Sequence, residues 1–257
     1  MSGNIALLGA DDPSPIVTKN PEGSSSFLLI GDHAGNRIPS VLGDMGLEPS
    51  ERTRHIAWDI GVARLGELLS AALDAVFVQQ VYSRLVIDCN RDPDAADAMP
   101  TVSDGTPVPA NAALDETRRV ARIAAIHKPY QAAIGAEIAR RQAKGQPTIL
   151  IALHSFTPVM RGLARPWQVG ILYNDGDPTF AQALLTALRD ERDLTVGDNE
   201  PYRMDLIDYT IPRHAYPDRL PYAEIEVRQD LIDDDAGCRD WCDRLVRVLG
   251  ATSMAMG

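Results

Sequence analysis

The chain has 257 residues, 45% of them hydrophobic and 24% charged, and its formal net charge is −11. This length and composition are typical of a globular protein that buries a substantial core. A chain this acidic lacks the general positive field with which proteins bind nucleic acid or anionic membranes, so we expect neither as a partner.

The cysteines and the first residues bear on the compartment. The chain has only three cysteines, at positions 89, 238 and 242, which argues against a disulfide framework and fits a reducing compartment. The start MSGNIALLGADDPSP lacks the basic residues and long apolar run of a signal peptide. No apolar run reaches the roughly 18 to 20 residues that cross a bilayer. We therefore expect a cytoplasmic protein, whose oligomeric state the sequence leaves open.

The first half of the chain begins with residues 1–24, which are rich in Pro, Gly, Ser and Asp and predict a loose lead-in. Apolar runs and their spacing then predict the elements that follow. They are a strand at 26–31, a long helix at 51–73, one or two strands within 75–91, and a long loop at 91–113. Loops of that length inside compact domains are often functional.

The second half continues the alternation of strands and helices. The predicted elements are a helical stretch at 115–145 with a bend near Pro129, strands at 148–156 and 167–174, a helix at 179–191, a strand at 222–230 and a helix at 235–250. This order predicts a single α/β layered domain with a largely parallel sheet over residues 1–257.

Several chemically capable side chains lie near the ends of predicted strands. In parallel sheets, ligands bind at the carboxyl ends of the strands. The residues that this rule brings to one crevice are His33, Asp88, Asn90, Arg91, His154 and Glu226.

Two of the five histidines, His33 and His154, directly follow separate apolar strands. Two imidazoles held by rigid strand ends are a sound start for a catalytic zinc site, which needs a third ligand from a carboxylate or another histidine. The alternative is that each histidine only caps its strand.

Five segments, in chain order, resemble the N-formylglutamate amidohydrolase family. They are GDHAGNRIP, AWDIG, YSRLVIDCNR, ALHSF and EIEVRQD, and the resemblance extends from about residue 25 to 250. The family is similar in fold to zinc carboxypeptidases and aspartoacylase-type amidases. The resemblance therefore implies a three-layer α/β/α architecture with a mixed, largely parallel sheet.

The resemblance also implies a metal site. His33 and His154 match the two metal histidines. In carboxypeptidase-like enzymes the first histidine belongs to an HxxE pair, but Asn36 stands at the glutamate position, and a neutral amide is a poor zinc ligand. Asp59, in AWDIG, is then the expected third ligand, with His55 in reserve. The alternative for Asp59 is the polar face of a long helix.

Glu226 is the expected general base, since the family has a Glu-x-Arg pattern at this point. A carboxylate beside a metal-activated water can take its proton and pass it to the leaving amine. Without the resemblance, the alternation of the strand favours a solvated outer face for both Glu224 and Glu226.

The resemblance assigns Asn90 and Arg91 to a clamp on the substrate carboxylate, and the fork of an arginine suits two-point contact. A second carboxylate needs another cation, for which Arg161 and Arg165 are candidates unless they are ordinary surface charges. Asp88 is expected to pair with Arg84 or with a metal histidine.

The remaining histidines are given other roles. His214 lies in the proline-rich segment IPRHAYPD, expected to be a loop over the pocket, and we expect it to donate a hydrogen bond to the oxyanion. His127, on a predicted helix, is expected to be structural. Ser155 has no G-x-S-x-G elbow around it, which argues against a serine hydrolase.

Together these features predict a zinc-dependent amidohydrolase with His33, Asp59 and His154 as metal ligands, one Zn²⁺ per chain, and Glu226 and His214 in catalysis. The predicted substrate is a small anionic N-acyl amino acid. The resemblance implies N-formyl-L-glutamate, cleaved to L-glutamate and formate in histidine catabolism. One alternative is the same chemistry on another N-acyl amino acid or a peptide. The other is a non-catalytic binding protein, which Asn36 favours.

Overall fold

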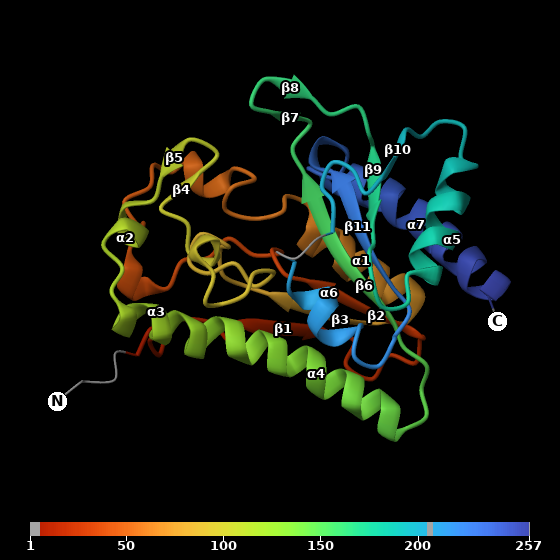
Figure 1. Ribbon diagram of the computed structural model, residues 1–257, viewed down its shortest axis with the longest axis horizontal. Coiled ribbons are helices and arrows are strands. Elements are labelled where there is room, and N and C mark those ends of the chain that lie inside the picture. Colours follow the sequence, from red (N-terminus) through yellow and green to blue (C-terminus); the bar gives the residue numbers. More distant parts are fainter. Residues whose placement is uncertain (1–5, 205–207, 257) are drawn as a thin grey trace.

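A seven-stranded mixed sheet forms the centre of the computed structural model, which describes residues 6–204 and 208–256 (Figure 1). The strand order is β1-β3-β2-β6-β11-β9-β10. The strands are β1 (Ile16–Lys19), β2 (Phe27–Gly31), β3 (Val76–Gln80), β6 (Ile149–Phe156), β9 (Val169–Leu172), β10 (Val196–Asp198) and β11 (Tyr222–Arg228). The β1–β3 and β11–β9 pairs are antiparallel, and the other pairs are parallel.

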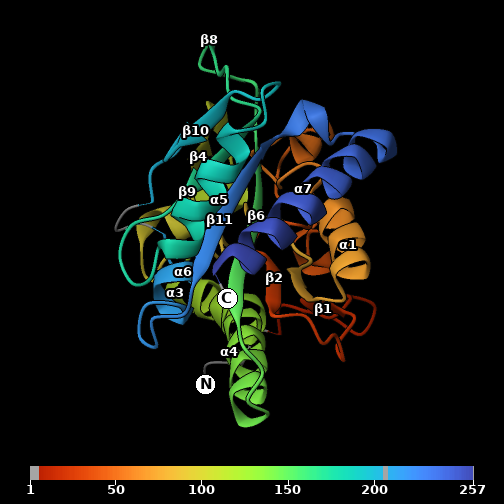
Figure 2. The same cartoon turned by 90° about the vertical axis from the view of Figure 1, so that its right-hand side faces the viewer.

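Helices cover both faces of this sheet, which confirms the predicted three-layer α/β/α fold. On one face, α1 (Val62–Leu73), α7 (Asp235–Met256) and α5 (Thr179–Arg189) pack side by side (Figure 2). On the other face lie the long α4 (Lys128–Ala143) and the short α6 (Thr210–His214). Among the described residues, no helix is long and apolar enough to cross a bilayer.

Two hydrophobic cores hold the layers together, one on each face of the sheet. Successive side chains of a strand point to opposite faces. Ile151 and Ile225 therefore pack in the core beneath α1, α5 and α7, while Leu150 and Tyr222 pack in the core on the α4 side. Strands buried on both faces read as continuous apolar runs, which is why β2 and β6 were recognisable in the sequence.

The helix expected at 51–73 begins only at Val62. Residues 51–53 form a 3₁₀ turn, and residues 54–61 form turns that bring Asp59 towards the sheet. Gly61 ends this segment with φ of 85°, and a Cβ there would lie 2.1 Å from the carbonyl oxygen of Ile232. Close packing of another chain segment thus overrides the helical periodicity.

The apolar run at 75–91 also differs from its prediction, because only Val76–Gln80 is a strand. Leu85, Val86 and Ile87 are buried in turns that fill the core on the α4 side. The long helical stretch is divided into α3 (Glu116–Arg122), a π-helical turn (Ile123–His127) and α4.

Several short elements were not predicted. They are β1 within the expected lead-in, β10, α2 (Pro109–Ala112), α6 in the proline-rich segment, the β4–β5 hairpin (Val102–Ser103 and Thr106–Pro107), the β7–β8 hairpin (Val159–Met160 and Leu163–Ala164), and the 3₁₀ turns Ser40–Leu42, Ala96–Ala98 and Gln229–Leu231. Both hairpins flank the pocket described below.

Candidate active site

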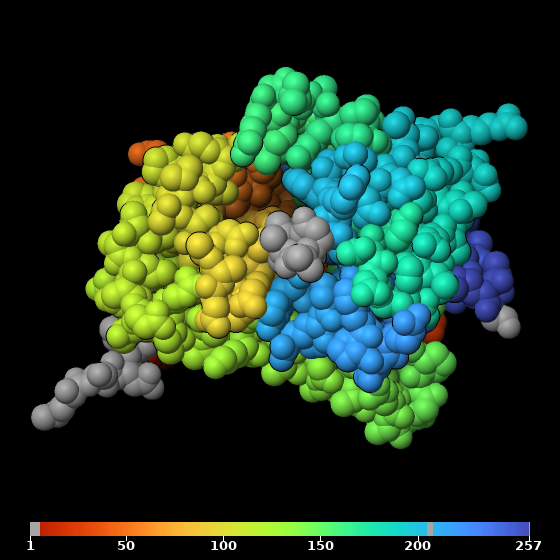
Figure 3. Space-filling view, in the orientation of Figure 1, coloured from red at the N-terminus to blue at the C-terminus, as the bar shows by residue number. Residues whose placement is uncertain are grey.

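A pocket of about 410 Å³ opens at the carboxyl ends of β2, β6 and β11. Figure 3 shows the hollow between residues of the 92–107 segment, in yellow, and the β7–β8 hairpin, in green. Its walls carry His33, which follows β2, and His154, near the end of β6, together with Asp59, Glu226 and Arg91. The topology thus brings residues from the whole length of the chain to one crevice.

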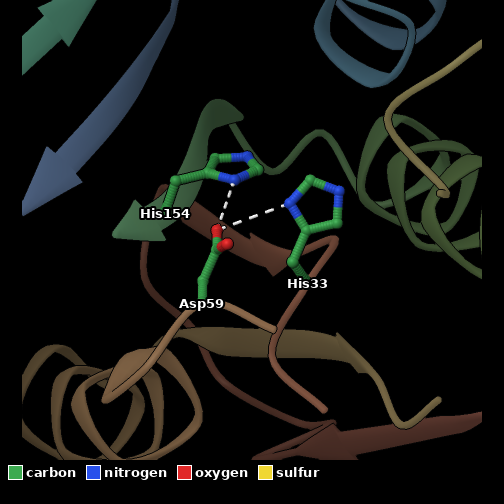
Figure 4. A group of neighbouring side chains, drawn as sticks. All are labelled: His33, Asp59 and His154. Atoms are coloured by element: carbon green, nitrogen blue, oxygen red, sulfur yellow. Dashed lines mark hydrogen bonds and ion pairs between the residues drawn. The ribbon is translucent and has the colours of Figure 1, made fainter. Parts of the chain in front are cut away.

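His33, Asp59 and His154 lie together at the floor of this pocket (Figure 4). Asp59 Oδ2 lies 2.9 Å from Nδ1 of His154 and 3.4 Å from Nδ1 of His33. One potential ligand atom from each residue falls within 4.8 Å of the others, and all three side chains are buried. This spacing is compact enough for the three side chains to hold one metal ion.

Backbone contacts fix the cluster in place. The amide of Asp59 donates to the carbonyl oxygen of His33 at 2.9 Å, which ties their two segments together. The Ser155 hydroxyl donates to the carbonyl oxygen of Ile60 at 2.8 Å and ties them to β6. The same close packing requires a glycine at position 35. A Cβ there would lie 2.0 Å from the carbonyl oxygen of Val81.

The second nitrogen of each imidazole faces a carboxylate. Nε2 of His33 lies 2.7 Å from Oδ1 of Asp88, and Nε2 of His154 lies 3.2 Å from Oδ2 of Asp32. Metal-binding histidines commonly turn their other nitrogen to a carboxylate in this way, which sets the tautomer and orients the ring. Asp32 was missed in the sequence, although its position directly before His33 was a usable signal.

The charges around the imidazoles favour a cation. Asp32, Asp59 and Asp88 are buried, and among the described residues the arginine paired with them is Arg84, at 2.7 Å from Asp88 and 3.5 Å from Asp59. With neutral imidazoles, three carboxylates and one guanidinium leave two negative charges. Although burial favours their neutral form, neighbouring charges lower the pKa of Asp32, Asp59 and Asp88.

The neighbouring carboxylates also shift the pKa values of His33 and His154. Burial and Arg84 oppose protonation of His33, yet Asp88 and Asp59 raise its pKa. Burial also opposes the charge of His154, but its pKa is raised well above the ordinary value by the surrounding carboxylates. Nδ1 of His33, the nitrogen that faces Asp59, is buried without a hydrogen bond to any described residue. This orphaned nitrogen and the negative field fit a divalent metal ion.

Glu226 lies beside this cluster on the neighbouring strand. In the parallel pairing of β11 with β6, it stands opposite His154. Glu224 and Glu226 are only 3% and 5% exposed, so the solvated outer face considered from the sequence is wrong. Burial raises the pKa of Glu226 to about 7 and that of Glu224 well above the ordinary range. A carboxylate with a pKa near 7 suits general-base work.

Asn90 and Arg91 line the pocket, but both also hold neighbouring segments. Oδ1 of Asn90 accepts hydrogen bonds from the amides of Tyr209 and Thr210, each at 3.0 Å. The Arg91 guanidinium donates to Asp97 at 3.1 Å and to the carbonyl oxygen of Asn90 at 2.9 Å. Arg91 is thus partly occupied by partners within the chain.

Other predicted residues do not come to the pocket wall. Arg161 is exposed at the tip of the β7–β8 hairpin, with φ of 50°. His214 lies on α6, where its Nε2 is 2.7 Å from Oε1 of Gln131. Asn36 donates through Nδ2 to the carbonyl oxygen of Arg52 at 3.3 Å. Asp59 therefore lies with the two histidines, while the Asn36 side chain is turned to Arg52.

The other two histidines have different surroundings. His55 lines the pocket, and its Nε2 lies 3.3 Å from Oδ2 of Asp104 on the β4–β5 hairpin. His127 is buried, with Nε2 3.0 Å from the carbonyl oxygen of Arg91. Tyr202 also lines the pocket and was missed, because an isolated tyrosine in a loop gives no sequence signal.

Comparisons with known proteins point to one family. The family model described as N-formylglutamate amidohydrolase matches residues 25–233. Among solved structures, a gene product from Agrobacterium tumefaciens is 35% identical, with a TM-score of 0.94 over 97% of this chain and 99% of that chain. The N-formylglutamate amidohydrolase from Ralstonia eutropha shares the fold, with 20% identity and a TM-score of 0.71 over 94% of this chain and 98% of that one. No curated protein matches the chain.

Proposed function

The chain belongs to the N-formylglutamate amidohydrolase family, and we propose that it hydrolyses the acyl amide of an N-acyl amino acid with the help of a bound metal ion. The first substrate to test is N-formyl-L-glutamate, which would give L-glutamate and formate. The observation that carries the proposal is the His33–Asp59–His154 cluster, in which each imidazole turns its second nitrogen to a buried carboxylate.

His33, Asp59 and His154 would hold the metal, for which Zn²⁺ is the expected identity because two imidazoles and a carboxylate form a common catalytic zinc set. When bound, such an ion acidifies a water and polarises the acyl carbonyl. Asp88 and Asp32 keep the two imidazoles in their orientation. A catalytic zinc site uses three protein ligands, so no further side chain is needed to hold the ion.

Glu226 supplies the proton transfer. Its carboxylate takes a proton from the water that attacks the acyl carbon, and then gives it to the amine nitrogen as the C–N bond breaks. The products are a carboxylic acid and a free amino acid. Arg91 and Asn90 line the same pocket and are assigned to the substrate carboxylate. Arg161 and His214 have no role in this proposal, since they lie outside the pocket wall.

The test begins with the metal content of protein purified without added metal. Formate release from N-formyl-L-glutamate is then measured before chelation, after chelation and after Zn²⁺ is restored. We expect one zinc per chain and activity that disappears and returns with the metal. His33→Ala should lose both the metal and the activity.

A panel of N-acetyl, N-formyl and peptide substrates separates this reaction from its nearest alternative. Turnover of another member in place of N-formyl-L-glutamate would keep the metal-dependent reaction and change the substrate. Absence of turnover across the panel with zinc bound would leave the binding-protein alternative. Full activity of a metal-free His33→Ala protein would contradict the proposed role of the cluster.

A further inference from the structure

Tyr202 and Arg165 form a pair at the edge of the pocket. Nη1 of Arg165 donates to the Tyr202 hydroxyl at 3.0 Å, and the guanidinium carbon lies 4.7 Å from the centre of the same ring. It also lies 5.9 Å from the ring of Phe156. Arg165 forms no ion pair with any described residue, so its charge is directed at this phenol.

The hydrogen bond leaves the phenol with a proton to donate. A tyrosine hydroxyl is both a donor and an acceptor, and here the acceptor side is occupied by Arg165. Within residues 6–204 and 208–256, no acceptor is recorded for the hydroxyl proton. A hydroxyl that accepts from a cation becomes a stronger donor, since hydrogen bonds in a chain polarise one another.

The surroundings also keep this proton on the oxygen. Tyr202 is 39% exposed as a residue, yet partial burial and the carboxylate of Glu226 raise its pKa, and Arg165 offsets only part of that rise. The phenol is therefore neutral near pH 7. Tyr202 and Glu226 both line the pocket, so the phenol and the expected general base share one cavity.

Two other cations of the pocket, Arg84 and Arg91, are engaged with partners in the chain. Arg84 contacts Asp88 at 2.7 Å and Asp59 at 3.5 Å. Arg91 donates to Asp97 and to the carbonyl oxygen of Asn90. The phenol of Tyr202 thus offers a donor that has no competing acceptor among the described residues.

We propose that the Tyr202 hydroxyl donates a hydrogen bond to the acyl oxygen as negative charge develops on it, and that Arg165 is a positioning residue for this phenol. The inference rests on the proposed amidohydrolase function, and it gives Tyr202 the oxyanion role that the sequence assigned to His214. No bond is made or broken at Tyr202, and its proton stays on the phenol throughout.

The test uses the metal-loaded full chain and compares Tyr202→Phe, Arg165→Met and Arg165→Lys. Loss of one oxyanion donor lowers kcat by about 10²-fold or more. We expect that loss in Tyr202→Phe with KM changed by less than about threefold, since the bond strengthens only in the transition state. Arg165→Met should lose about 10-fold in kcat, and Arg165→Lys should recover part of it, because a lysine can still donate to the phenol.

A matched pair elsewhere in the chain provides the control. Nη1 of Arg213 donates to the Tyr209 hydroxyl at 3.0 Å, with the guanidinium carbon 5.5 Å from the ring centre, and neither side chain lines the pocket. Tyr209→Phe and Arg213→Met should keep kcat within about twofold of the parent. Equal losses in both pairs would overturn the assignment by showing a general effect of the substitution.

A second readout does not depend on turnover. A phosphonamidate analogue of the N-acyl amino acid mimics the tetrahedral intermediate, and Tyr202→Phe should weaken its binding, measured by calorimetry, by about 10²-fold while substrate binding changes little. If the parent hydrolyses an N-acyl amino acid but Tyr202→Phe keeps its kcat and its affinity for the analogue, the proposed function stands and the Tyr202 inference fails. If the parent hydrolyses none, both fail.

Discussion

Nε2 of His33 and the guanidinium of Arg84 contact the same carboxylate from opposite sides. Asp88 Oδ1 lies 2.7 Å from the imidazole, and Asp88 Oδ2 lies 2.7 Å from Nη2 of Arg84. The Asn90 amide also donates to Oδ1, at 2.9 Å. The carboxylate is thus held in place by three donors, and it fixes the His33 ring so that Nδ1 faces Asp59.

Asp88→Asn should therefore weaken metal binding without removing a ligand. The amide cannot accept from both Arg84 and His33 as the carboxylate does, so the imidazole loses its orienting partner. Loss of such a partner lowers metal affinity by about 10- to 100-fold. A competition titration with a chromogenic chelator measures this change.

The control for this variant is Asp104→Asn, which removes a carboxylate from the same pocket but one that pairs with His55 and Arg54 instead. Its zinc affinity should equal that of the parent within about twofold. If Asp88→Asn also bound zinc like the parent, Asp88 would have no part in orienting the metal ligand.

Glu226→Gln should remove most of the activity, because general-base catalysis contributes about 10²- to 10⁴-fold. Glu224→Gln is the matched comparison on the same strand face. Burial raises the pKa of Glu224 well above its ordinary value and so favours the neutral carboxyl. Glutamine resembles that neutral form, and we expect kcat within about fivefold of the parent. Equal losses in the two variants would remove the distinction between the two carboxyls.

The pH dependence of the activity follows from the titration of Glu226. A general base works only when deprotonated, so kcat/KM should rise with pH as Glu226 loses its proton. Burial sets that pKa at about 7 in the metal-free protein, and a bound cation moves it lower. The acidic limb of the profile therefore lies at or below pH 7. A rate that falls as pH rises from 5 to 7 would contradict this assignment.

The strand ends were the predictable part of the site. His33 and His154 follow long apolar runs, and the carboxyl ends of neighbouring parallel strands meet at one edge of the sheet. That rule alone indicated that the two imidazoles lie together. Asp59 was foreseen only through the family resemblance, because the helical periodicity around it predicted a continuous helix where the structure has turns.

The predictions that failed concern residues whose positions depend on contacts between distant segments. His214 was expected in an open loop, yet Thr210–His214 is a helix packed against α4, and Gln131 on α4 accepts from its ring. The burial of Glu224 and Glu226 follows from the segments packed over β11, which the alternation of one strand cannot reveal. Tyr202 reaches the pocket from a loop whose path is set by tertiary packing.

The partly buried position of His214 makes stability depend on pH. Burial, followed by the nearby Arg213, lowers its pKa to about 4, while the unfolded chain has the ordinary value of about 6.5. Between these values the unfolded state binds a proton that the folded state does not, so stability is full above about pH 6.5 and falls as pH drops towards 4. The loss reaches at most about 3 kcal/mol.

His214→Gln isolates this contribution from those of the other histidines. Glutamine can still donate to Gln131 but does not titrate. Urea unfolding at pH 7 and pH 5 should show a smaller loss of unfolding free energy in the variant than in the parent. An identical loss in both proteins would show that another group causes the acid sensitivity.

Arg141 joins the end of α4 to the start of β2 from a fully buried position, with 0% exposure. Its guanidinium donates to the carbonyl oxygens of Ser25 and Phe27, each at 2.9 Å, and to Glu137 at 2.9 Å. Arg141→Met keeps the apolar stem but removes the donors to both carbonyl oxygens. The Ser25 carbonyl keeps Gln146 and Glu137 keeps Arg140, so we expect a loss of about 1 to 3 kcal/mol in unfolding free energy. Arg140 contacts the same Glu137 at 2.7 Å from a more exposed position. Arg140→Met should cost less than about 1 kcal/mol. Urea unfolding of the two variants decides the point, and equal losses would show that the backbone contacts of Arg141 contribute nothing beyond its ion pair.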